Sequence, residues 1–251
     1  MRDGDELKLL LLGVDLAWHS DRNPTALAIG ELLDGVLRLK AIEVELFPVE
    51  QLMQYLRDIE GLMGVAIDAS LIIPNQTGQR PCEKALSRVY GSRGAACHAS
   101  NTSLYPQADS VALSRQLSRE GFQHLGHAKW QIECYPHPAM IEIFGLERRL
   151  LYKKGSVAQK RAGQKQLAEL IGRLYNSPML PLEIAPDLQN YFDPAEIDQL
   201  AGRSLKSNED ALDAVFCLYI AGLYALNAQG VVFGDLEAGY IWVPQGCKLA
   251  D

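Results

Sequence analysis

The sequence lacks the features that mark secreted and membrane proteins. Its five cysteines are odd in number and none are spaced as Cys-x-x-Cys, which indicates a reducing compartment rather than disulfide-bonded secretion. No apolar stretch runs uninterrupted for the roughly 20 residues that a membrane-spanning helix needs. The opening segment MRDGDELK carries acids where a signal peptide carries basic residues. We therefore expect a soluble, cytoplasmic protein.

The sequence also lacks an excess of positive charge. Its net charge is −7, which disfavours indiscriminate binding to nucleic acid. Basic residues nevertheless gather, because seven of them and no acid lie between Arg148 and Ala168. This cluster is typical either of a phosphate-binding surface or of a solvated helix face. With 251 residues, 48% of them hydrophobic, we expect a single domain over residues 1–251 with a loop-rich insertion at about 69–105.

The most informative stretch is the apolar run Leu9–Trp18, which reads LLLLGVDLAW. It is too short for a membrane and does not alternate with polar residues, so it predicts a central strand covered on both faces. Asp15 interrupts the run near its end. A carboxylate in such a place loses hydration and needs a cation or several hydrogen-bond donors nearby.

The segments that follow predict a mixed sheet. After a turn-like stretch, Trp18–Pro24, strands are expected at Thr25–Gly30 and Val36–Leu46, joined by a short turn, which indicates an antiparallel three-strand meander. Val49–Ile59 has helical spacing, and Gly61–Asp68 is a further apolar strand that again ends in an aspartate.

The second half of the chain alternates helices with fewer strands. Residues 69–105 are rich in loops, which is typical of a functional lid or flap. The further elements that we expect are helices at Pro81–Tyr90, 107–120, 157–175 and Ser207–Asn227, a strand at Ala128–Tyr135, and a closing hairpin at Val231–Val243. The fold class predicted is α/β, a mixed sheet of an antiparallel three-strand meander plus parallel strands, with helices on both faces.

Five carboxylates occupy positions where carboxylates are costly. They are Asp15 and Asp68 at the ends of apolar strands, Glu133 on a third strand, and Asp210 with Asp213 one helical turn apart in the first turn of the last long helix. If the strand ends lie side by side beneath that helix, the acids converge and repel unless a cation compensates them. Hard oxygen ligands suit Mg²⁺ or Mn²⁺. Two such ions about 4 Å apart can support phosphodiester cleavage.

Each carboxylate also has a purely structural interpretation. Ser207–Asp210 has the pattern of a capping box, in which Asp210 only completes the helix start. Asp15 and Asp68 are also placed where aspartates initiate turns. Glu133 sits where it can pair with a basic residue of a neighbouring strand.

Several motifs carry a resemblance to a known family. The helix segment Asn208–Ala214 resembles the last catalytic helix of ribonuclease H-like resolvases. More closely, the chain resembles the domain of unknown function 429 family, whose members are predicted ribonuclease H-like nucleases. The motifs that carry this resemblance are Gly13-Val-Asp15-Leu-Ala, Ile67-Asp68-Ala, Arg80-Pro-Cys82-Glu83, Glu133-Cys-Tyr135-Pro136, Tyr152-Lys153-Lys154-Gly155 and Glu209-Asp210-Ala-Leu-Asp213-Ala.

The resemblance implies that the mixed sheet is ribonuclease H-like, and it implies roles for the aspartates; the roles expected of the arginine, Glu83 and the lysines follow from their chemistry alone. Asp15 corresponds to a metal ligand that bridges two ions, Asp68 to the ligand of the second strand, and Asp213 with Asp210 to the helix pair. The expected activity is a metal-dependent nuclease acting on nucleic acid or a nucleotide-like phosphodiester. Arg80 is expected to hold a phosphate and Glu83 to anchor the lid, unless the two form an internal ion pair. Lys153 and Lys154 are expected to contact backbone phosphate.

Four other functions remain open at this stage. One is a catalytically inactive ribonuclease H-like module that binds nucleic acid or nucleotide without turnover. An actin-like phosphotransferase shares the strand order but needs a glycine-rich hairpin after Asp15, where this sequence has no glycine before Gly30. A zinc site would use the two pairs His124-x-x-His127 and Cys134-x-x-His137. A thiol enzyme would use Cys82 with His98.

Overall fold

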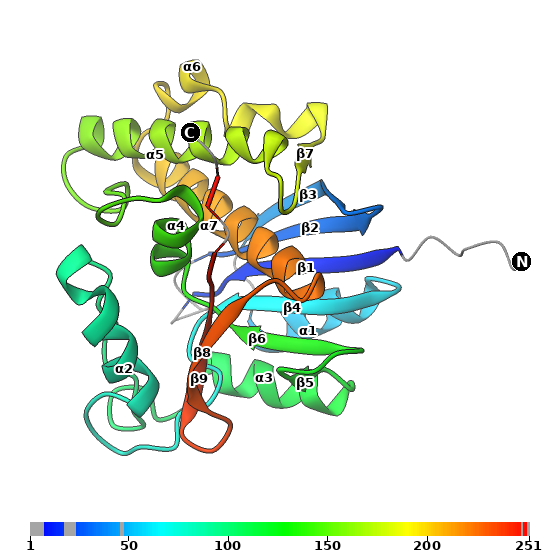
Figure 1. The fold of residues 1–251 in the computed structure, drawn as a ribbon, viewed down its shortest axis with the longest axis vertical. Helices are drawn as coiled ribbons and strands as arrows, with labels where there is room; N and C mark the ends of the chain where they lie inside the picture. Colours follow the sequence, from blue (N-terminus) through cyan, green and yellow to red (C-terminus); the bar gives the residue numbers. More distant parts are fainter. Residues whose placement is uncertain (1–7, 18–23, 46–47, 247, 250–251) are drawn as a thin grey trace, which may run out of the picture.

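The molecule is organised around one seven-stranded mixed sheet (Figure 1). The computed structural model describes residues 8–17, 24–45, 48–246 and 248–249, so the predicted turn at Trp18–Pro24 lies almost wholly outside them, as does Leu46. Hydrogen-bonded neighbours give the strand order β5-β6-β4-β1-β2-β3-β7. This order places β1, the predicted central strand, in the middle of the sheet.

The antiparallel meander is confirmed. It consists of β1 (Leu9–Asp15), β2 (Thr25–Leu33) and β3 (Val36–Glu45). The β2–β3 turn is only Asp34-Gly35, both with positive φ of 53° and 73°, which is why an aspartate and a glycine stand there. The loop between β2 and β3 is therefore shorter than the sequence pattern indicated.

The remaining strands of the sheet are parallel to their neighbours. Strand β4 (Leu62–Asp68) pairs with β1, β6 (Trp130–Glu133) pairs with β4, and β5 (Gln123–His124) lies at one edge. At the other edge β7 (Leu182–Ile184) pairs with β3. Strands β5 and β7 are too short to produce a recognisable pattern in the sequence. The fold is thus α/β with a mixed sheet, consistent with a ribonuclease H-like arrangement.

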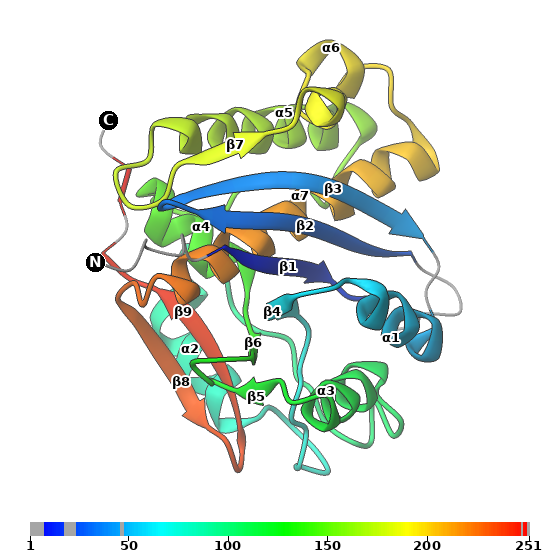
Figure 2. The ribbon, with the colours of Figure 1, turned by 90° about the vertical axis from the view of Figure 1, so that its right-hand side faces the viewer.

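Helices cover both faces of the sheet (Figure 2). Helices α1 (Val49–Asp58) and α3 (Asp109–Arg119) cover one face, and the other face carries α4 (Pro136–Phe144), α5 (Val157–Arg173) and α7 (Gly202–Ala225). Strand β1 contributes Leu11 to the second core and Leu12 to the first, because successive side chains of a strand point to opposite faces. No helix within the described ranges has the length and apolar character that crossing a membrane requires.

The insertion and the C-terminal hairpin form a separate layer beside the sheet. Helix α2 (Pro81–Tyr90) packs against a two-stranded sheet of β8 (Gly230–Asp235) and β9 (Gly239–Pro244) around a small apolar core. An isolated bridge from Cys134 to Trp242 joins this hairpin to the end of β6. The short helices η1 (Gly91–Arg93), η2 (Leu174–Asn176), η3 (Pro186–Tyr191) and α6 (Pro194–Ile197) complete the connections.

The start of α7 differs from the prediction. The helix begins at Gly202 rather than Ser207, because the Ser204 hydroxyl accepts a hydrogen bond from the Ala201 N–H and so caps the helix earlier. The segment Ser207–Asp210 therefore lies inside the helix. The capping-box interpretation of Asp210 is wrong, as is the placement of both aspartates in the first turn.

A close approach of backbones fixes α7 on the sheet. A Cβ atom placed on Gly13 of β1 would lie 2.0 Å from the Leu218 nitrogen and 2.2 Å from the Ala214 oxygen. Both are backbone atoms of α7, so they cannot move aside as a flexible side chain can. Only a glycine at this position lets the helix backbone rest directly on β1.

Replacing this glycine tests the contact. Gly13→Ala is expected to lower the free energy of unfolding by at least roughly 1–3 kcal/mol, because an added methyl group forces the helix off the strand. Urea unfolding followed by circular dichroism measures the loss. Gly172→Ala is the matched control: a Cβ there meets nothing within 4 Å, so α5 is expected to keep or gain stability. Equal stabilities for Gly13→Ala and the wild type would contradict the proposed contact.

Candidate functional site

The two strand-end aspartates lie side by side. Asp15 and Asp68 are direct partners in the register of the parallel pair β1 and β4. Their side chains point to the same face as Leu11 and Ala66, whose side chains belong to the core beneath α7. Both aspartates are partly exposed, so the carboxyl ends of the two strands carry adjacent carboxylates that solvent can reach.

Helix α7 brings two more carboxylates to the same place. Asp210 and Asp213 are buried, with exposed fractions of 3% and 0%. Asp210 lies within hydrogen-bonding reach of Asp15, and the charge of Asp213 acts on both Asp15 and Asp68. The structure therefore gathers four aspartates, which we call the aspartate cluster: Asp15, Asp68, Asp210 and Asp213.

Two lysines and a tyrosine hold the helix pair of the cluster. Lys153 Nζ lies 2.6 Å from Asp213 Oδ2, and the Tyr152 hydroxyl donates to Asp213 Oδ1 over 2.5 Å. Lys206 Nζ lies 2.5 Å from Asp210 Oδ1. Lys206 Nζ also lies 2.9 Å from Oε1 of the buried Glu209, so four ionised aspartates facing two ammonium groups leave at least two negative charges without a counterion. Such an imbalance is costly away from bulk water.

The acidity of the cluster reflects this imbalance. Burial raises the pKa of Asp15 and raises that of Asp68 further, and neighbouring aspartates add to both shifts against the opposing charge of Lys153. Burial and the adjacent Asp15 raise the pKa of Asp210 to about 8. Without a cation, the cluster therefore retains protons near neutral pH.

The donor chemistry of the cluster fits a divalent ion. The Asp210 Oδ2 atom is buried and has no hydrogen-bond donor within the described part of the chain, although Asp15 lies close by. Two facing carboxyl groups need a proton or a cation between them. In the described ranges no three His, Cys, Asp or Glu side chains stand ready as a metal site. Instead, Lys153 pairs with Asp213 and Lys206 pairs with Asp210.

Glu133 does not join the aspartate cluster. Its carboxylate accepts hydrogen bonds from Arg80 Nη1 and Nη2, at 2.9 and 2.6 Å, and from the Leu71 N–H at 2.9 Å. The predicted alternation of β6 explains this, because Ile132 and Cys134 pack into the core under α7 whereas Glu133 points to the opposite face. The structure thus places Glu133 with a buried arginine, which comes from the start of α2 and not from a neighbouring strand as the structural interpretation predicted.

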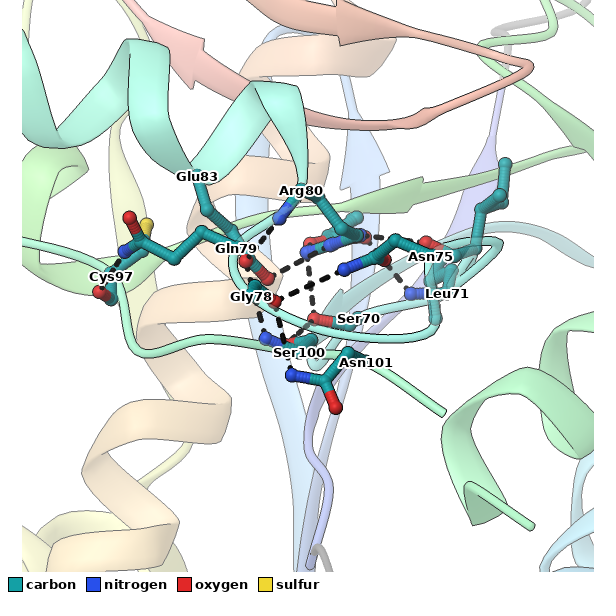
Figure 3. A network of polar contacts seen from close by, with 12 residues as sticks. Ser70, Leu71, Asn75, Gly78, Gln79, Arg80, Glu83, Cys97, Ser100 and Asn101 are labelled. Atoms are coloured by element: carbon teal, nitrogen blue, oxygen red, sulfur yellow. Dashed lines mark hydrogen bonds and ion pairs between the residues drawn. The ribbon is translucent and has the colours of Figure 1, made fainter. Parts of the chain in front are cut away.

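Arg80 is the centre of a buried polar network (Figure 3). Its exposed fraction is 1%, and its five N–H groups donate to Glu83, Glu133, Ser70 and the Ile72 carbonyl. Glu83 also accepts from the backbone N–H groups of Arg80 and Ser100. An arginine with every donor engaged has none left for a phosphate. The internal ion pair with Glu83 is what the structure shows, and Glu83 ties together the two ends of the insertion.

The two lysines predicted to contact phosphate have different surroundings. Lys153 is 31% exposed and paired with Asp213, so it belongs to the aspartate cluster as a counterion. Lys154 is exposed and lines the neighbouring cavity. Tyr152 and Lys206 were not assigned a role from sequence. Tyr152 belonged to a family motif, whereas nothing in the sequence pairs Lys206 with Asp210 except their spacing of four residues.

The zinc and thiol alternatives gain no support from the structure. His124 hydrogen bonds to Ser114 and Tyr240, and Cys134 lies 3.7 Å from the Cys217 sulfur, so each has other partners. Burial raises the pKa of Cys82 to about 12, which keeps this thiol protonated and a poor nucleophile.

The fold and the site together define a class. It is an α/β protein whose mixed sheet is consistent with a ribonuclease H-like arrangement and which carries aspartates at the carboxyl ends of two adjacent parallel strands and on the helix that crosses them. The chain belongs to the family described as protein of unknown function (DUF429), whose model matches residues 13–238. This range includes the whole aspartate cluster and the insertion. No curated protein and no solved structure matches the chain.

Removing Arg80 tests the buried network. Arg80→Met is expected to lower the free energy of unfolding by about 3–5 kcal/mol, because two buried carboxylates lose their counterion. Arg38→Met serves as the control, since its pair with Glu183 is partly exposed and such pairs contribute about 0–1 kcal/mol. Both losses are measured by urea unfolding. Similar values for the two variants would show that the Arg80 network is not a stabilising centre.

The raised pKa of Asp210 makes stability depend on pH. In the absence of divalent ions, folded Asp210 keeps its proton up to about pH 8, whereas the unfolded chain releases it near 3.8. The folded state binds more protons between these values, so the free energy of unfolding falls as pH rises from about 4 to about 8. Asp210→Asn is expected to flatten this slope in urea unfolding with a chelator present. An unchanged slope would contradict a raised pKa of Asp210 in the folded state.

Proposed function

We propose that the protein is a Mg²⁺- or Mn²⁺-dependent phosphodiesterase that acts on nucleic acid or a nucleotide-like substrate. The observation that carries the proposal is the aspartate cluster, in which four carboxylates meet only two lysines. A divalent cation supplies the two positive charges that the cluster lacks. Hard oxygen ligands are also the ligands that these two ions prefer.

The residues that would hold the ions are those of the cluster. Asp15 is next to Asp68 on one side and Asp210 on the other, which suits it to bridge two ions, while Asp213 would complete the set. When bound, the ions would activate a water molecule and stabilise the leaving oxygen of a phosphodiester. Asp68 stands where related nucleases often carry the longer Glu, so the choice between Mg²⁺ and Mn²⁺ is expected to depend on it.

The chain's own cations would act on the substrate phosphate. Lys153 is fixed by Asp213, and Asp213 in turn by the Tyr152 hydroxyl, so its ammonium group is positioned at the edge of the cluster. Gly163 of α5 maintains this position, because a Cβ there would lie 2.0 Å from the Leu151 oxygen and 2.6 Å from the Tyr152 Cα. Lys154, the next residue, is free to meet a phosphate at the surface.

A binding module without turnover is the second candidate. The observation that favours it is the pairing of Lys153 with Asp213 and of Lys206 with Asp210, since these lysines already neutralise half of the cluster. Titration of Mn²⁺ combined with a cleavage assay separates the two functions. A phosphodiesterase binds the ion and turns over substrate, whereas an inactive module binds a nucleotide without cleaving it.

Substitution of the bridging aspartate tests the activity. Asp15→Asn is expected to reduce Mn²⁺-dependent cleavage of bis(p-nitrophenyl) phosphate and of a labelled single-stranded oligonucleotide by more than about 100-fold, because a residue that would hold the ions loses its charge. The fold is expected to remain intact by circular dichroism. The control is Asp198→Asn, an aspartate that pairs with Lys165 at the surface and whose loss is expected to leave cleavage unchanged.

The series is completed with Asp68→Asn and Asp213→Asn. Wild-type turnover in all three variants would refute the mechanism. Tight binding of Mn²⁺ by the wild type without cleavage of either substrate would instead favour the binding module.

A further inference from the structure

A cavity of about 250 Å³ adjoins the aspartate cluster. Asp68 and Lys153 form part of its wall, so the cavity and the cluster share a boundary. Its other walls come from the end of the insertion, from the start of α4, from β9 and from residues 149–154. We call it the side pocket.

The charges that line the side pocket suit a phosphate group. Arg149, Lys153 and Lys154 line it from one short segment. Two glutamates of the lining, Glu83 and Glu133, are both bound by Arg80, whose single positive charge offsets one of their two negative charges and whose N–H groups engage both carboxylates. The pocket therefore presents cations on one side and Asp68, with the cluster behind it, on the other.

An unpartnered imidazole marks a position for an uncharged polar group. His137 lines the side pocket and is 7% exposed, and its buried Nδ1 has no hydrogen-bond partner within the described ranges. Its ring lies 5.8 Å from the Tyr135 ring and 5.5 Å from the Tyr152 ring. Burial and the nearby Lys153 lower the pKa of His137 to about 4, so this ring is neutral at physiological pH and offers a hydrogen bond without adding charge.

The walls of the side pocket are fixed rather than open to expansion. The Arg80 network holds the insertion from within (Figure 3), and Gly239 of the hairpin lies against it, since a Cβ there would be 2.7 Å from the Ile72 oxygen and 2.9 Å from Arg80 Nη1. The volume is below the roughly 300–1,000 Å³ of pockets for drug-sized ligands. A pocket of this size admits about one nucleotide and excludes a base-paired duplex.

We propose that the side pocket binds a single nucleoside monophosphate unit, with its phosphate at Lys153 and Lys154 and its base or sugar against Tyr135 and His137. The unit is either a free mononucleotide or the last nucleotide of a single strand. The consequence for the proposed phosphodiesterase, on which this part rests, is that the enzyme cleaves next to a single-stranded end. The binding itself does not depend on that activity.

Binding is tested without metal. AMP, GMP, CMP and UMP are each titrated into the full-length protein by calorimetry in the presence of a chelator, and at least one is expected to bind. Lys154→Ala and His137→Gln are expected to weaken that binding by roughly tenfold or more, as the loss of a charge-assisted or buried hydrogen bond does. Lys84→Ala, an exposed lysine on α2 outside the pocket, is the control and is expected to bind like the wild type.

Three results would overturn the pocket. One is the absence of binding by all four nucleotides. Another is equal binding by Lys154→Ala, His137→Gln and the wild type. Binding that weakens equally in Lys84→Ala would also refute it, because it would show a general effect of surface charge.

The cleavage pattern separates this inference from the proposed function. With Mn²⁺ present, a single-stranded oligonucleotide labelled at one end is expected to shorten by one nucleotide at a time, while a blunt duplex and a circular single strand stay intact. Cleavage of the circle would refute the end-binding pocket and leave the phosphodiesterase in place. Binding of a mononucleotide with no cleavage of any strand would refute the phosphodiesterase and leave the pocket in place, with a free mononucleotide as its ligand.

Discussion

The contact between Gly13 and the backbone of α7 is the constraint on which the site depends. Because β1 has no side chain at that point, the helix lies directly on the strand, and Ala214 and Leu218 touch it. Asp213 immediately precedes Ala214, and Asp210 lies one turn earlier, so the same contact places both above the end of β1. The convergence of the aspartates thus follows from a packing requirement two residues away from Asp15.

Electrostatics then determines what the cluster can do. The lysines that oppose it come from separate elements, Lys153 from the segment before α5 and Lys206 from α7 itself, and each binds one aspartate of the helix. The strand pair, Asp15 and Asp68, has raised pKa values as a result of burial and of the nearby charge of Asp213, and Asp15 adds to the shift of Asp68. Because the contacts of both lysines are with the helix aspartates, the strand pair is the side of the cluster at which we propose that a divalent ion and a phosphate enter.

Local patterns in the sequence predicted the meander and the strand-end aspartates, because an apolar run that stops at a carboxylate is visible without knowledge of the fold. The same reasoning failed for a local cap of less familiar sequence, for a pair of residues far apart in the chain and for the shortest strands. The start of α7 depends on Ser204 and not on the better-known Ser207–Asp210 pattern. The pairing of Lys153 with Asp213 joins residues sixty positions apart, and β5 and β7 have too few residues to show any periodicity.

The family motifs divide into two groups with different physical tasks. The aspartates, Tyr152 and Lys153 form a site whose charges are incompletely balanced, whereas Arg80, Glu83 and Glu133 form a network in which every arginine donor is engaged. A buried network whose arginine donors are all engaged resists rearrangement, since breaking any part leaves a buried group without its hydrogen bonds. This network holds the insertion where it walls the side pocket, and a role of the insertion as a lid stays a prediction. The wall limits the size of the side pocket, and so it acts on the choice of ligand even though every donor of Arg80 is already engaged.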